Sequence, residues 1–133
     1  MSKSKRTKQN KFCALGSLYQ GEKPRNLRVA LQSLLNQSLA VPVVLVIDGP
    51  ISSELRDVVK QFANQIYRII ELPENVGLGP ALNEGIKIID NEFDYLIRFD
   101  TDDINASQRF ETLIGAIERS RACLLYTSPS PRD

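Results

Sequence analysis

Short apolar runs alternate with amphipathic stretches along the chain, and this alternation predicts four strand–helix units. The apolar runs 12–18, 41–48, 67–72 and 95–99 have the length and the composition of buried strands. After each run, apolar residues recur at the 3.6-residue period of a helix. The repeating residues are Leu27, Ala30, Leu31, Leu34 and Leu35, then Leu55, Val58, Val59 and Phe62, then Leu82, Ile86 and Ile89, and finally Phe110, Leu113, Ile114 and Ile117.

The residues between the runs indicate where the helices begin. Pro24 and Pro80 suit a first helical turn, where the missing N–H has no partner to lose. Ser52 or Ser53 can cap the second helix, and Ser107 can begin the fourth. Residues 73–80, PENVGLGP, are predicted to form a loop.

The order of the units predicts an α/β fold with a Rossmann-like parallel sheet and helices on both faces. Ligands of such sheets bind beyond the carboxyl ends of the strands. The polar residues of interest share this location, because each lies at the end of a predicted strand or just after it. They are Ser17 and Tyr19, Asp48, Asn75 and Gly77, and Asp100 and Asp102.

The fourth strand ends in an acidic cluster, FDTDD, which contains Asp100, Asp102 and Asp103. Carboxylates this close repel one another unless water or a cation compensates their charge. In an extended segment Asp100 and Asp102 can reach the same side, and hard cations such as Mg²⁺ and Mn²⁺ prefer such oxygen ligands. A bound cation would also stabilise a departing diphosphate. The alternative is that Asp102 or Asp103 only caps the next helix.

Each remaining candidate has a structural alternative. Asp48 can accept hydrogen bonds from a base or a ribose, or it can be an ordinary turn residue before Gly49. Tyr19 can stack on a base or simply lie at the rim of the sheet. Gly77 and Gly79 permit close approach of a ligand to the backbone, but their loop lacks the dinucleotide-binding spacing.

Composition narrows the chemistry. The net charge of +1 gives no general reason to expect a nucleic-acid or membrane partner. The chain contains no histidine, so catalytic triads, metal sites and general bases that use histidine are excluded. Cys13 lies in an apolar run and is expected to be a buried thiol.

Both ends of the chain differ from the segment 12–122, which we predict to be the folded domain. Residues 1–11 are basic and lack an apolar core, so we expect a disordered tail rather than a signal peptide. Residues 123–133, CLLYTSPSPRD, do not continue the helical period. Their back-translation resembles a sequencing-library adapter, so we expect this segment to be foreign and the natural protein to continue past Ala122.

Four motifs together resemble family 2 glycosyltransferases of the GT-A fold, in particular those of bacterial exopolysaccharide and surface-glycan assembly. The motifs are SLYQGEKPRNLRVALQSLLNQSL, VLVIDGP, ELPENVGLGPALNEGI and RFDTDDINASQRF, within residues 12–121. The resemblance implies the nucleotide-binding half of that fold, which transfers a sugar with inversion. It also implies a nucleotide-sugar donor, usually UDP-linked, and Mn²⁺ or Mg²⁺.

The resemblance assigns roles to individual positions. Ser17, Tyr19 and Asp48 match positions around the donor base. Asp102 matches the metal ligand, and Asp100 matches a ribose or metal contact. A loop-and-helix pattern of structural role is matched by Asn75, Gly77 and Asn83.

Two positions depart from the family pattern, since Ile47 replaces a frequent acid and Ser107 a frequent proline. The family's catalytic base lies well beyond the acidic motif, so we expect it after residue 122 and assign none. The chain on its own is therefore expected to be inactive. The resemblance implies a glycan or lipid-linked acceptor. We expect a cytoplasmic location, because no signal peptide is predicted and nucleotide sugars are found there, with peripheral contact with the inner membrane face as a further possibility.

Two other functions remain open from the sequence. The run LIRFDTDDI resembles the first motif of haloacid-dehalogenase-like phosphatases, in which Asp100 would be the nucleophile. However, Ile104 stands where that motif has threonine, and the motif normally begins the fold. The chain could also be a non-catalytic nucleotide-binding fragment.

Overall fold

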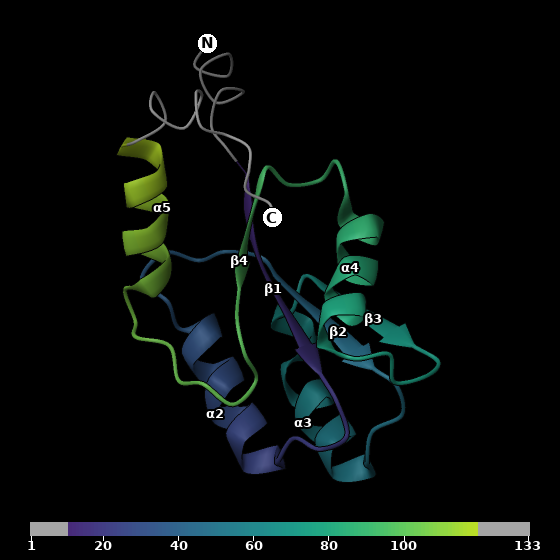
Figure 1. Ribbon diagram of the computed structural model, residues 1–133. Helices are drawn as coiled ribbons and strands as arrows, with labels where there is room; N and C mark the ends of the chain where they lie inside the picture. Colours follow the sequence, from purple (N-terminus) through teal and green to yellow (C-terminus); the bar gives the residue numbers. More distant parts are fainter. Residues whose placement is uncertain (1–10, 120–133) are drawn as a thin grey trace.

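A computed structural model of the chain describes residues 11–119, which alternate between strands and helices as the apolar pattern predicts (Figure 1). The elements are β1 (Phe12–Leu18), α2 (Pro24–Leu35), β2 (Val43–Asp48), α3 (Ser53–Phe62), the short 3₁₀ helix η1 (Ala63–Gln65), β3 (Arg68–Leu72), α4 (Leu78–Ile89), β4 (Tyr95–Arg98) and α5 (Arg109–Arg119). The predicted foreign segment 123–133 and residues 1–10 of the predicted tail lie outside the described residues.

The four strands form one parallel sheet in the order β3-β2-β1-β4. The central strand β1 pairs with β2 from Ala14 opposite Val43, and with β4 from Phe12 opposite Tyr95. All four strands therefore end at the same edge of the sheet. This arrangement confirms the predicted α/β fold.

Helices cover the two faces of the sheet unequally, with α2, α3 and α5 on one face and α4 on the other (Figure 1). Leu27, Leu55 and Phe110 bring the first three helices onto the larger apolar core. On the opposite face, α4 packs through Ala81 and Ile89. The larger core holds Phe12, Leu45 and Ile97 from the strands, whereas the smaller one holds the alternate residues Cys13, Leu15, Val44 and Val46.

Helix α4 approaches the sheet closely because glycine stands at position 85. A Cβ atom there would lie 2.7 Å from Val46 Cγ2 and 3.2 Å from Leu15 Cδ1. The helix therefore buries Ala81, Gly85 and Ile89, whereas Ile86 of the predicted apolar repeat is exposed. A search for large apolar residues does not detect such a small-residue contact.

Several predicted boundaries shift for identifiable reasons. Helix α4 begins at Leu78, inside the predicted loop 73–80, and its first helical bond runs from the Ala81 N–H to the Gly77 carbonyl. Strand β2 begins at Val43, after Pro42, which has no N–H to donate. Helix α5 begins at Arg109, two residues after Ser107. Lys11, which we placed in the tail, is bound to Asp94. Its backbone N–H donates to the Asp94 carboxylate, and its carbonyl accepts the Asp94 N–H.

Two sequence predictions about individual residues are confirmed. The Ser52 hydroxyl caps α3 by accepting the Leu55 N–H at 3.1 Å. Cys13 is a buried free thiol, and its burial together with the smaller effect of the Glu92 charge raises its pKa to about 12. Within residues 11–119, the helices are too short or too polar to cross a bilayer.

The Gly85 contact can be tested within α4. Gly79→Ala, in the first turn of the same helix, is the control without overpacking, because a Cβ atom at position 79 meets nothing within 4 Å. We expect Gly85→Ala to be less stable than Gly79→Ala by about 1–3 kcal/mol, the usual cost of overpacking a core. Chemical denaturation of the two variants measures the difference, and equal stabilities would contradict the close approach.

Candidate functional site

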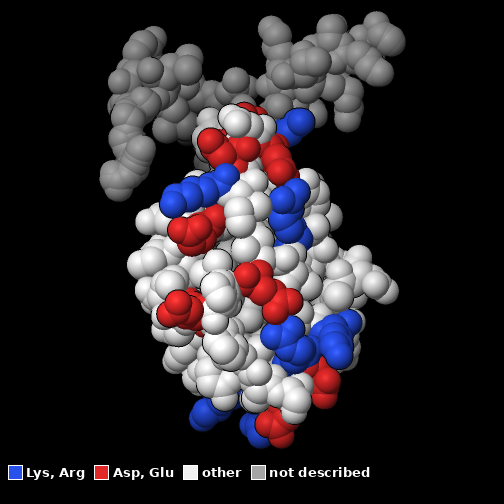
Figure 2. Space-filling model, turned by 90° about the vertical axis from the view of Figure 1, so that its right-hand side faces the viewer, with Lys and Arg blue, Asp and Glu red and all other residues white. Residues whose placement is uncertain are grey.

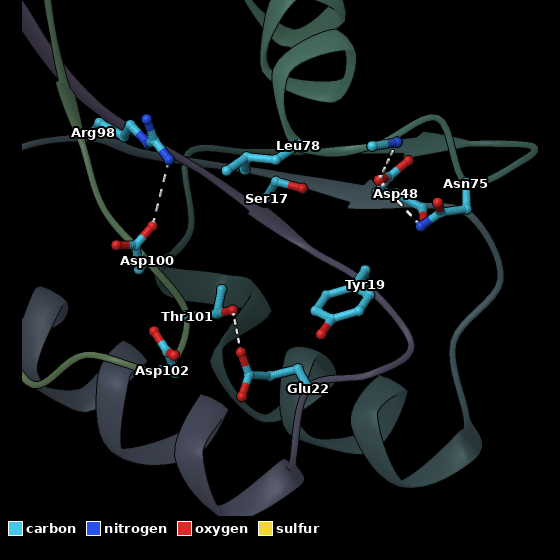
Figure 3. A pocket seen from close by; sticks show the side chains of 11 residues that line it. Ser17, Tyr19, Glu22, Asp48, Asn75, Leu78, Arg98, Asp100, Thr101 and Asp102 are labelled. Carbon is cyan, nitrogen blue, oxygen red and sulfur yellow. Dashed lines mark hydrogen bonds and ion pairs between the residues drawn. The ribbon is translucent and has the colours of Figure 1, made fainter.

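The carboxyl edge of the sheet carries a cavity of about 570 Å³ (Figure 3). Its lining comes from the last residues of β1, β2 and β4 and from the segments that follow all four strands. The lining residues are Ser17, Tyr19, Glu22, Asp48, Asn75, Gly77, Leu78, Arg98, Asp100, Thr101 and Asp102. The structure therefore brings together the donor-site and metal-site residues predicted from the sequence. Asn83 is exposed on α4 and does not line this cavity.

One end of the cavity is built around the carboxylate of Asp48, which is 2% exposed. Its Oδ1 accepts the Val76 N–H at 2.7 Å, and its Oδ2 accepts the Gly77 N–H at 3.0 Å. The Asn75 side-chain amide donates to Oδ2 and to the Asp48 carbonyl, both at 3.2 Å. Asp48 thus fixes the loop between β3 and α4, which is a structural role that the sequence analysis did not assign.

The backbone around Asp48 depends on two glycines with positive φ, Gly49 at 90° and Gly77 at 98°. L-residues with side chains rarely adopt this conformation. A Cβ atom at position 49 would also lie 2.6 Å from the Asn75 backbone nitrogen. The turn after β2 and the loop after β3 can therefore come together only with glycine at position 49.

Tyr19 lies at the cavity between Asp48 and Glu22 and is 51% exposed (Figure 3). Its ring occupies the space that a side chain at position 21 would need, since a Cβ atom on Gly21 would lie 2.4–2.6 Å from the ring. Gly21 therefore permits this ring position. An aromatic ring with an exposed face is suited to stacking on a planar ligand.

Asp100 and Asp102 of the acidic cluster line the other end of the cavity, and Asp103 lies beside them. Carboxylate oxygens of Asp100, Asp102 and Asp103 lie within 4.8 Å of one another, and all three residues are exposed. The segment forms a turn, with the Asp103 N–H donating to the Asp100 carbonyl at 3.3 Å, and not the extended segment that we considered. Because α5 begins at Arg109, neither Asp102 nor Asp103 caps it.

Among the described residues that line the cavity, Arg98 is the basic one, and it lies next to the acidic cluster. Its guanidinium lies 3.9 Å from the Asp100 carboxylate, and both side chains are exposed. At this exposure the ion pair contributes about 0–1 kcal/mol. It leaves the guanidinium available to a ligand.

The segment that follows the acidic cluster is bound to the end of α2. The Gln37 side-chain amide donates to the Ala106 carbonyl at 2.7 Å, and its oxygen accepts the Phe110 N–H at 2.9 Å. The Asn105 N–H donates to the Ser33 hydroxyl at 2.9 Å. Ser33 of α2 and Gln37 just beyond its end therefore hold the segment that follows the acidic cluster.

Sequence reasoning missed four cavity residues, namely Glu22, Leu78, Arg98 and Thr101. Glu22 is one of several acids in the chain, and its partner Thr101 lies 79 residues away. Arg98 did carry a signal, because a charged residue in an otherwise apolar strand next to an acidic cluster indicates exposure at the strand end.

Charges elsewhere on the molecule are mixed. The side that carries α4 and β3 shows acidic and basic side chains interspersed with neutral ones (Figure 2). The exposed ion pair Arg56–Glu71 and the partly buried pair Arg68–Glu92 link charges of opposite sign.

The comparisons with known proteins agree with this geometry. The model of the family "Glycosyl transferase family 2" matches residues 19–132. The chain belongs to glycosyl transferase family 2.

Two curated relatives illustrate the match. The amylovoran biosynthesis glycosyltransferase AmsE of Erwinia amylovora is 44% identical over 109 residues, 80% of this chain and 40% of the relative. An Escherichia coli enzyme named UDP-Gal:alpha-D-GlcNAc-diphosphoundecaprenol beta-1,3-galactosyltransferase is 37% identical over 106 residues, 78% of this chain and 38% of the relative. The chain thus spans about two fifths of the length of these relatives.

Solved structures share the fold. S. aureus TarS 1–349 in complex with UDP-GlcNAc aligns with a TM-score of 0.70 at 22% identity, covering 84% of this chain and 32% of that one. The mannosyltransferase PcManGT from Pyrobaculum calidifontis, in complex with GDP-Man and Mn²⁺, aligns with a TM-score of 0.66 at 18% identity, covering 86% and 33%. These alignments confirm the predicted GT-A-type sheet.

Asp48 gives a test of the site's construction. Asp48→Ala leaves the Val76 and Gly77 N–H groups without their acceptor, so we expect the free energy of unfolding to fall by about 1.5–3 kcal/mol. Asp57→Ala, an exposed acid on α3, is the matched control and should change it by less than about 0.5 kcal/mol. Urea denaturation measures both, and a neutral Asp48→Ala would show that the carboxylate does not hold the loop.

Proposed function

We propose that this chain is the donor-binding part of an inverting glycosyltransferase that moves a sugar from a nucleotide diphosphate sugar, UDP-linked, to a glycan or lipid-linked acceptor. One observation carries the proposal. A single cavity combines a fixed carboxylate, Asp48, and an exposed aromatic ring, Tyr19, with Asp100 and Asp102 of the acidic cluster. This combination suits a ligand with a planar base at one end and a diphosphate at the other.

The two ends of the cavity bind different parts of the donor. Tyr19 stacks on the base, Asp48 accepts a hydrogen bond from it, and Ser17 borders it from the end of β1. Asp100 contacts the ribose or shares the metal. A volume of about 570 Å³ lies within the range of about 300–1,000 Å³ that is usual for small-molecule sites.

The acidic cluster fits a divalent cation, Mn²⁺ or Mg²⁺. Three carboxylates within 4.8 Å supply the hard oxygen ligands these ions prefer, and their mutual repulsion makes the site more favourable for a cation. Asp102 and Asp100 would hold the ion, with Asp103 beside them. When bound, it supplies charge neutralisation for the departing diphosphate.

The chain's own residues bind and orient the donor, and we assign no catalytic base among them. The names of the relatives support a role in exopolysaccharide assembly and an acceptor carried on diphosphoundecaprenol. An acceptor of that kind would place the protein in the cytoplasm at the inner membrane face. Membership of family 2 favours this function over the phosphatase alternative, in which Asp100 would form an aspartyl phosphate.

The metal site can be tested by ligand-induced stabilisation. We expect UDP with Mn²⁺ to raise the melting temperature of the chain by several degrees, since ligand at 100 times Kd stabilises by about 2.7 kcal/mol. UDP without metal should have much less effect. Asp102→Ala should abolish the metal-dependent part, because it removes a principal ligand, and differential scanning fluorimetry reports the shift.

Asp57→Ala is the control for this experiment, because it removes one exposed negative charge that does not line the cavity. It should retain the full shift. If Asp102→Ala also retains it, the acidic cluster is not the metal site.

The stacking role of Tyr19 can be tested without changing Tyr19 itself. Gly21→Ala introduces a Cβ atom into the space of the ring, so the ring must move. Stacking contributes about 1–3 kcal/mol per base, so we expect UDP affinity to fall at least about fivefold. Tyr19→Ala should fall by a similar factor and the double variant no further, as measured by calorimetric titration. An unchanged affinity in Gly21→Ala would contradict the stacking.

A further inference from the structure

The segment that carries the acidic cluster contains one buried residue, Thr101. Asp100, Asp102 and Asp103 are exposed, whereas Thr101 between them is only 5% exposed. The Thr101 hydroxyl donates to Glu22 Oε1 at 2.7 Å (Figure 3). This hydrogen bond joins the segment after β4 to the loop between β1 and α2.

Glu22 is itself held in place on both sides. Its second carboxylate oxygen, Oε2, accepts the Lys23 N–H at 3.1 Å, and its own N–H donates to the Tyr19 carbonyl at 3.1 Å. The acceptor offered to Thr101 is therefore fixed by the short loop that also carries Tyr19. The sequence analysis did not identify Glu22 as a functional residue.

The hydrogen bond between Thr101 and Glu22 restrains a turn that carries three carboxylates. Their charges repel, so a free turn would separate them and would have to be reassembled each time a cation bound. A cation site gains affinity when its ligands are already held in position. Within the turn itself Thr101 is the buried attachment point, because Asp100 and Asp102 on either side of it are exposed.

We propose that Glu22 is a positioning residue for the cation site: through Thr101 it holds the carboxylates of Asp100 and Asp102 in the arrangement that binds a divalent ion. This inference rests on the proposed function, because it assumes that the acidic cluster binds a metal. It assigns Glu22 no contact with the ion itself. Four substitutions separate these roles.

The measurement is Mn²⁺ affinity in the presence of saturating UDP, followed from the EPR signal of free Mn²⁺ with the full 133-residue chain. Thr101→Val removes the hydroxyl while keeping the shape, and Glu22→Ala removes the acceptor. We expect each to weaken Mn²⁺ binding about tenfold or more, because a hydrogen bond to a charged group is worth about 10- to 150-fold in an equilibrium constant. The double variant should be no weaker than the single variants, because both remove the same interaction.

The conservative substitutions should restore binding. Thr101→Ser keeps the donor and Glu22→Gln keeps an acceptor oxygen, so both should bind Mn²⁺ within about threefold of the wild type. If Glu22→Gln is as weak as Glu22→Ala while Thr101→Val binds normally, Glu22 is a direct ligand and the inference is wrong. The inference also fails if Glu22→Ala and Thr101→Val bind Mn²⁺ like the wild type, whatever their melting temperatures.

The wild-type chain separates this inference from the proposed function. If it binds no Mn²⁺ with UDP, the metal-dependent donor site is wrong, and the positioning role is wrong with it. If it binds Mn²⁺ and only the variants behave against expectation, the donor site stands and the role of Glu22 alone is overturned.

Discussion

The parallel pairing of β1 with both of its neighbours is the constraint on which the rest of the structure depends. Ser17 lies opposite Val46 of β2, and Leu15 lies opposite Arg98 of β4. Since parallel strands end at one edge, these registers place the residues after each strand around a common space. A shift by one residue would turn Ser17 and Arg98 to the other face and bring apolar side chains to the edge.

The two ends of the cavity are built in physically different ways. At the Asp48 end, a buried carboxylate is surrounded by donors, so its charge is compensated within the protein. At the Asp100 end, like charges lie together in solvent with the exposed Arg98 as their partner. Helix α2 links the two ends, because its preceding loop carries Tyr19 and Glu22 while Ser33 and Gln37 hold the segment after the acids.

The sequence was sufficient to predict the order of the elements and most of the cavity's acids, because both follow from local patterns. β-Branched runs predict buried strands, and acids directly after them must lie at the sheet edge. The order of strands in the sheet, the α4 contact through Gly85 and the pair Glu22–Thr101 were not predicted. These features depend on residues far apart in the chain, and neither glycine nor threonine carries a strong local signal.

The carboxylate of Asp48 also connects the edge of the sheet to the motion of the neighbouring loop. The Val76 and Gly77 amides are bound to its two oxygens, so they can exchange with solvent hydrogen only when these bonds open. Any ligand that engages the same carboxylate acts on that opening equilibrium. The exchange rates of the Val76 and Gly77 amides, which lie on a surface loop, therefore report whether a ligand occupies the Asp48 end of the cavity.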